Sequence, residues 1–136
     1  MKNLLFLILL FSISSCKSQN ETDALSIGYE AITRGSSIEI RATSNLIHYE
    51  DVETEKQFKP TKEDWKSIES LIEEIELSEM QQFKAPSEES FVDAALQATL
   101  SISINNKTYR SERFDHGNPP EELKKIIEKL FDLISE

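Results

Sequence analysis

The spacing of the apolar residues alternates between two periods along this chain, and this alternation limits the folds that it can adopt. Between positions 25 and 52, and again between 96 and 114, apolar residues recur at every second position. Between 62 and 77, and from 119 onward, they recur at every third or fourth position. A period of two places apolar side chains on one face of a strand, whereas a period near 3.6 places them along one stripe of a helix. The chain therefore predicts an α+β fold in which each element buries one side.

Five segments carry the period of a strand. Turn residues such as Arg34-Gly35 and Ser44-Asn45 separate the first three, which predicts an antiparallel meander. Asn105-Asn106 follows the clearest strand and suits a tight hairpin, because asparagine tolerates a positive φ. The charged residues 53–59 are interpreted as a connection. The predicted strands are Leu25–Ala31, Ile38–Arg41, Leu46–Val52, Leu96–Ile104 and Lys107–Phe114.

Two segments predict amphipathic helices. The first helix, Lys62–Leu77, follows a capping box in which Thr61 is the N-cap and Asp64 is the third helical residue. The second helix is expected to start after Asn118 as its N-cap, with Pro119 at the first helical position. Its apolar stripe runs as far as Ile134.

The order of these elements is strand, strand, strand, helix, strand, strand, helix. It predicts a two-layer α+β sandwich, in which an antiparallel sheet of about five strands carries both helices on one face. The other face, with Thr99, Ser101 and Ser103, is expected to be polar and open. Residues 78–93 form the longest irregular stretch, in which Met80 and Phe83 are expected to form one helical turn against the core.

The first sixteen residues predict where the protein lies in the cell. An unbroken apolar run from Leu4 to Phe11 follows Lys2, and it is too short for a transmembrane helix, which needs about 20 residues. A charged start, a short apolar run and small residues before a cut are typical of an export signal. The ending Ile13-Ser14-Ser15-Cys16 resembles the lipobox of bacterial lipoproteins. The resemblance implies that a diacylglycerol is attached to the Cys16 thiol, that the chain is cut before this residue, and that the new amino terminus is acylated.

An ordinary cleaved signal with a chance cysteine is the alternative. Cys16 is the only cysteine, so no disulfide can form within the chain, and lipidation would account for a thiol in an oxidising compartment. The resemblance divides the chain into a signal peptide (1–15), a lipidated cysteine with a flexible tether (16–23), and a single α+β domain (24–136). Lys17 stands where an aspartate would resemble an inner-membrane retention signal, which favours the outer membrane without deciding the leaflet.

The charge of the chain limits its partners. Lys and Arg number 15 against 25 Asp and Glu, a net charge of −10. An acidic chain argues against a nucleic-acid partner, which needs a basic patch. The charges are interspersed, so solubility is the simpler explanation of the acidic balance. The expected partners are the membrane, through Cys16, and an envelope protein.

Few residues suit catalysis or metal binding. His48 and His116 are the only histidines, and together with a single cysteine they cannot form a zinc site of the usual Cys/His type. Neither a phosphate-binding glycine loop nor a Gly-X-Ser-X-Gly motif is present. No cofactor and no metal are therefore expected.

Two polar segments are candidate ligand contacts. Asp115 and His116 lie between a strand and a helix, where such a pair could bind a metal or act as acid and base. A turn and a helix cap explain the same residues. Arg34, beside backbone amides in a turn, could receive a carboxylate or phosphate, although a plain turn is the favoured explanation.

The sequence therefore favours a non-enzymatic envelope module that binds a protein or an envelope ligand, and a protein inhibitor is one form of it. The domain itself resembles small envelope lipoproteins, from which no defined function carries over. The alternative is an enzyme or metal-dependent protein centred on Asp115 and His116. An enzyme predicts that these two side chains point into a pocket with further polar groups.

Overall fold

The structure is a computed structural model that describes residues 25–86 and 96–135. The predicted signal peptide, Cys16 and the tether lie outside the described residues, as does Phe91 of the irregular stretch. The described residues form an α+β fold with an antiparallel sheet of seven strands. The strands are β1 Ser26–Thr33, β2 Ser36–Thr43, β3 Ile47–Asp51, β4 Glu55–Phe58, β5 Gln97–Ile104, β6 Lys107–Arg110 and β7 Phe114–Asp115. The helices are α1 Lys62–Glu73, the 3-10 helix η2 Leu77–Gln82 and α2 Glu121–Ser135.

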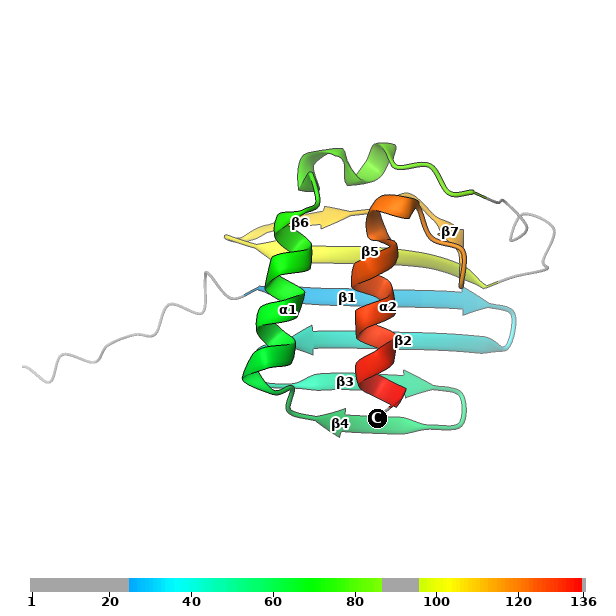
Figure 1. Ribbon diagram of the computed structural model, residues 1–136. Coiled ribbons are helices and arrows are strands. Elements are labelled where there is room, and N and C mark those ends of the chain that lie inside the picture. The colour runs from blue at the N-terminus through cyan, green and yellow to red at the C-terminus, as the bar shows by residue number, and fades with distance from the viewer. Residues whose placement is uncertain (1–24, 87–95, 136) are drawn as a thin grey trace, which may run out of the picture.

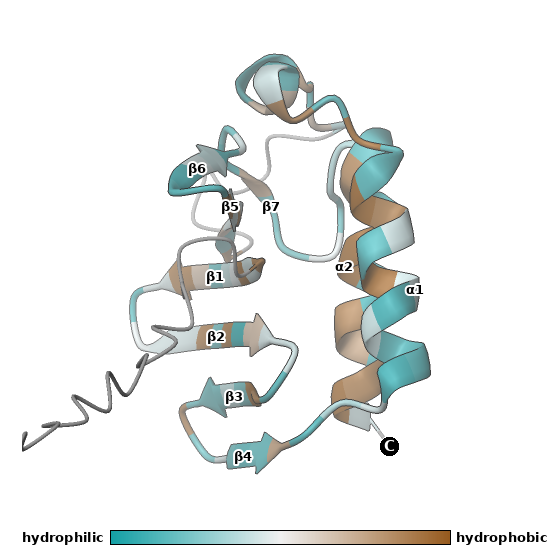
Figure 2. Cartoon of the chain, turned by 90° about the vertical axis from the view of Figure 1, so that its left-hand side faces the viewer, coloured by the Kyte–Doolittle hydropathy of each residue, from teal (hydrophilic) through white to brown (hydrophobic). Residues whose placement is uncertain are grey.

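The sheet order is β4-β3-β2-β1-β5-β6, and β7 also pairs with β5. Every pairing is antiparallel. Helices α1 and α2 lie across the same face of the sheet (Figure 1). Figure 2 views the strands from their ends and shows both helices on one side; in the described part of the chain no helix lies on the opposite side. That opposite side of the sheet is called the open face below.

The core lies between the sheet and these two helices. Alternate residues of the two central strands are buried, among them Tyr29 of β1 and Leu100 of β5, as the period of two predicts. Helix α1 contributes Ile68 and helix α2 contributes Leu130, both fully buried. Burying one such side chain stabilises the fold by roughly 1.5–3 kcal/mol. Each helix carries an apolar stripe, and the residues of this stripe are buried against the core.

The sheet is larger than predicted, because residues 55–58 form strand β4 instead of a connection. The Asp51 carboxylate accepts hydrogen bonds from the backbone N–H groups of Glu53 (2.8 Å) and Thr54 (2.7 Å), which reverses the chain after β3. The Lys56 ammonium donates to the carbonyl of Ile134 at the end of α2 (3.0 Å). The prediction failed because β4 is an edge strand, where charged side chains are tolerated and the apolar alternation is lost.

The predicted strand Lys107–Phe114 is divided into β6 and β7. Between them, the backbone N–H of Ser111 donates to the Leu100 carbonyl (2.9 Å), and the Ser111 hydroxyl accepts from the Leu100 N–H (3.0 Å). A side chain therefore replaces a backbone acceptor and interrupts the ladder. The hairpin before β6 is confirmed, since Asn105 and Asn106 have φ values of 52° and 59°.

Both helices differ from the prediction at one end. The predicted cap is confirmed, because the Thr61 hydroxyl accepts from the Asp64 N–H (3.1 Å). Helix α1 ends at Glu73 rather than Leu77, and the chain continues into η2. The predicted helical turn is confirmed at Met80, which η2 buries, whereas Phe83 follows η2 as its extended C-cap.

Helix α2 begins at Glu121, so the prediction of Asn118 as its N-cap is wrong. The Asn118 N–H donates to the Asp115 carbonyl (2.8 Å), and this turn holds Asn118 outside the helix. The two successive prolines, Pro119 and Pro120, then separate this turn from the helix.

A double-mutant cycle tests the close approach of β1 and β5. A Cβ at Gly28 would lie 2.7 Å from the Ser101 hydroxyl oxygen, which donates to the Gly28 carbonyl (3.2 Å). In the parent, Gly28→Ala displaces this hydroxyl. The loss of its hydrogen bond offsets the stability of about 0.5–1 kcal/mol that alanine usually gains over glycine in a strand. In a Ser101→Ala background, Gly28→Ala should change the free energy of unfolding more favourably than in the parent, by about 1 kcal/mol. Urea unfolding of the four proteins measures this difference. Equal effects in both backgrounds would show that the two groups are not coupled.

Candidate functional site

His116 is held by a buried tyrosine and by aromatic packing. Its Nδ1 atom lies 2.7 Å from the Tyr29 hydroxyl, and its backbone N–H donates to the Leu96 carbonyl (2.8 Å). The imidazole ring packs against the rings of Tyr29 and Phe131, with centroids 6.0 Å and 5.7 Å away. This environment links the end of β7 to β1 and α2.

Burial sets the protonation of this pair. It lowers the pKa of His116 and raises the pKa of Tyr29, so both groups are neutral near pH 7. The neighbouring Asp115 is 2 % exposed and closes the turn to Asn118. Across residues 25–86 and 96–135, no three His, Cys, Asp or Glu side chains are grouped so that they could hold a metal ion. The arrangement at His116 therefore fits a structural hydrogen bond.

Arg34 and Asp115 lie at the same end of the sheet, because Ile32 and Asp115 both pair with Gln97. Their surroundings differ, since Arg34 is exposed in the β1–β2 turn and Asp115 is buried. Gly35 beside Arg34 takes a φ of 103°, a value that suits a tight hairpin turn. The predicted contacts Arg34, Asp115 and His116 thus share one end of the sheet but no common exposed surface.

The open face carries a feature that the sequence analysis did not predict. The pairing register places four glutamates directly opposite one another on β1, β2, β3 and β4. They are Glu30, Glu39, Glu50 and Glu55, and they are called the glutamate row below. Neighbouring strands lie about 4.8 Å apart, so the row is roughly 14 Å long.

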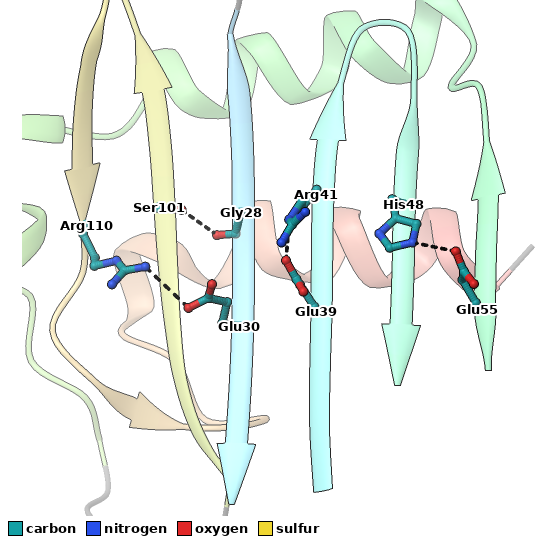
Figure 3. A network of polar contacts seen from close by, with 8 residues as sticks. All are labelled: Gly28, Glu30, Glu39, Arg41, His48, Glu55, Ser101 and Arg110. Atoms are coloured by element: carbon teal, nitrogen blue, oxygen red, sulfur yellow. Dashed lines mark hydrogen bonds and ion pairs between the residues drawn. The ribbon is translucent and has the colours of Figure 1, made fainter. Parts of the chain in front are cut away.

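Arginine and histidine side chains from neighbouring positions contact three members of the glutamate row, as Figure 3 shows. Arg110 contacts Glu30 (3.4 Å) and His48 contacts Glu55 (3.1 Å), while Arg41 pairs with Glu39 on the same strand. The hydrogen bond from His48, with a second from Gln57, lowers the pKa of Glu55. These pairs are accessible to solvent, which screens them, so they contribute little to stability.

Glu50 lies between Glu39 and Glu55 in the row, and its side chain is exposed. Within the described ranges, no ion pair joins Glu50 to a cation. Like charges directly opposite in a sheet destabilise it. The open face therefore keeps an unbalanced negative charge near the middle of the glutamate row.

An exposed apolar side chain accompanies the row. Ile32 lies two positions beyond Glu30 on the same face of β1 and is 57 % exposed. Val52, immediately after β3, is 63 % exposed. The polar open face is confirmed, since Thr99, Ser101 and Ser103 alternate with the buried residues of β5. Sequence alternation predicted the outward positions on β5, but it placed Glu55 in a connection instead of β4. The glutamate row also depends on the register between strands, which the sequence alone does not show.

Comparisons with protein-family models, with curated proteins and with solved structures found no match to this chain. In the part of the chain that the structure describes, no helix is both long and apolar enough to cross a membrane.

The Tyr29–His116 pair predicts a specific dependence of stability on pH. Because burial lowers the pKa of His116 in the folded protein, the unfolded chain binds a proton here first as the pH falls below about 6.5. The free energy of unfolding should therefore fall between about pH 7.5 and pH 5.5, and it should fall less in His116→Gln. Urea unfolding of both proteins at both pH values measures this difference. An identical loss of stability in the two proteins would contradict the role given to His116.

Proposed function

We propose that this protein is a lipid-anchored, non-enzymatic envelope module that binds a basic segment of a partner protein through its open face. The observation that carries this proposal is the glutamate row, which keeps unbalanced negative charge on a sheet face that no described helix covers. Real proteins break one or two local rules of stability at functional sites and compensate for them elsewhere. Solvation alone does not explain why four glutamates stand in one register row.

The chemistry of the row defines the partner. Lysine or arginine side chains on one face of a helix lie about 5–6 Å apart at positions i and i+4, close to the strand spacing of about 4.8 Å. A basic helix or loop could therefore place successive cations over successive glutamates. Ile32 adds an apolar contact at the edge of the charged row. Complementary charge gives such a complex its specificity and a high association rate.

The proposal treats the domain as a two-layer α+β sandwich with one covered and one open face. Its support is that α1 and α2 lie over the same face of the sheet in both views (Figures 1 and 2). A protein inhibitor is one form of this function, in which the open face covers the cleft of a basic enzyme.

An enzyme centred on Asp115 and His116 has less support. The side chain of Asp115 is buried, and His116 packs against Tyr29 and Phe131. Neither observation favours a general acid or base with access to substrate.

The anchor belongs to the same proposal. Lipid at Cys16, followed by a short polar tether, would hold the domain within roughly 15 Å of the membrane, at about 5–6 Å times the square root of the number of tether residues. Two or three acyl chains provide stable attachment, since each buried methylene contributes about 0.8 kcal/mol. Lys17 after the cysteine favours the outer membrane.

Reversing the charge at the middle of the row tests the binding function. Glu50→Lys should increase the free energy of unfolding by about 0.5–1 kcal/mol, because it replaces two repulsions with two attractions. The same change should reduce crosslinking of the full, tagged chain to its partner in intact envelopes. Glu128→Gln, on the exposed side of α2, is the control and should leave the crosslinked species unchanged. Damage to the fold cannot produce higher stability together with lost binding. A crosslinked partner that Glu50→Lys retains in full would refute the open face as the binding surface.

Replacing the predicted lipidation site tests the anchor. Cys16→Ser should abolish incorporation of labelled palmitate and shift the protein from the membrane to the soluble fraction. The removed side chain is the only thiol in the chain, so no other cysteine can accept the lipid. Equal labelling and equal membrane association of the variant and the parent would show that the lipobox reading is wrong.

A further inference from the structure

We infer that the protein has a second binding site, a groove between η2 and the first turn of α2 that accepts a basic peptide segment with an apolar anchor. The groove has a volume of about 370 Å³. Ligand pockets span about 300–1,000 Å³, so it has room for one or two side chains rather than a large ligand. It is lined by α1, η2 and α2, not by the outward side chains of the open face, and the inference does not depend on the proposed function.

The floor of the groove is apolar. Ile126 and Ile75 lie beneath it and are almost fully buried, so its accessible apolar surface comes from Leu71 of α1 and from Phe83. Phe83, just after η2, is only half-buried and packs against the core. An inserted aliphatic side chain would bury apolar surface against Leu71 and Phe83, which gives about 25 cal/mol of stabilisation per Å² removed from water.

The rim of the groove is acidic on both sides. Glu76 and Glu79 line one side, Glu121 and Glu122 line the other, and all four are exposed. The lysine that lines the groove, Lys125, already pairs with Glu74 (2.9 Å). The negative charge around the floor is therefore not neutralised by this lysine.

Each of these carboxylates has a local role, but none is paired with a cation among the described residues. Glu121 and Glu122 occupy the first turn of α2, where acidic residues stabilise a helix through its dipole. Glu79 stands in the first turn of η2, and the Glu76 carboxylate accepts a hydrogen bond from the Ser78 hydroxyl (2.6 Å). No ion pair within residues 25–86 and 96–135 joins any of the four to a lysine or arginine. In the described part of the chain these carboxylates form no group that could hold a metal ion. Charge complementarity therefore favours cationic side chains that flank one apolar residue, and it disfavours an acidic ligand.

Peptide binding tests this inference directly. The full chain in a neutral detergent is titrated into a fluorescent peptide that carries a central leucine between two lysines, and anisotropy is recorded. The same peptide with serine for leucine, and with glutamates for the lysines, should each bind more weakly. The double variant Glu79→Gln/Glu121→Gln should weaken binding of the lysine–leucine peptide about threefold to tenfold. Glu128→Gln, further along α2, is the matched control and should bind as the parent does.

A second variant separates binding from helix stability. Glu76→Gln/Glu79→Gln leaves the first turn of α2 intact, and it should also weaken binding. Absence of saturable binding to the parent, equal binding of the glutamate peptide, or undiminished binding by either double variant would each overturn the inference. Variants of the open face are not involved, so the outcome is separate from that of the proposed function.

Discussion

The burial of β1 is the constraint on which the rest of the structure depends. This strand pairs with β2 on one side and with β5 on the other, so its backbone is hydrogen-bonded along both edges. Its inward side chains meet the helix layer, and the Tyr29 ring lies edge-on to Phe131 of α2 with centroids 5.2 Å apart. The Tyr29 hydroxyl then positions His116 and with it the turn that leads into α2. One central strand thus orients both the sheet and the helix that covers it.

The same burial explains why the open face can carry repulsive charge. A slip of one residue would move the whole apolar set of β1 into solvent, so the core determines the register. Each large buried side chain stabilises by roughly 1.5–3 kcal/mol, whereas an opposed pair of like charges costs roughly 0.2–1 kcal/mol. The core therefore dominates, and Glu30, Glu39, Glu50 and Glu55 remain aligned. The proposed binding function uses a charge pattern that the register imposes and the core can tolerate.

Local signals predicted the elements well where the chemistry is local. The cap at Thr61, the hairpin at Asn105-Asn106 and the turn at Met80 are confirmed, because each depends on residues within a few positions of one another. Strand β4 was missed because an edge strand does not need an apolar alternation. The N-cap at Asn118 was wrong because that residue pairs with Asp115 instead. Of the three predicted contacts in the domain, Arg34 is exposed in its turn, but Asp115 is buried and His116 binds a distant tyrosine.

The sequence by itself determined the α+β class, the two amphipathic helices and, on the strands with an apolar alternation, which residues face outward, since all of these follow from the period of the apolar residues. Only the tertiary structure decided which outward residues become neighbours. The members of the glutamate row lie on four different strands, and the walls of the groove between η2 and α2 come from segments that are distant in the sequence. Periodicity assigns a residue to a face, but strand register and helix packing assign its neighbours, and both depend on burial across the whole core.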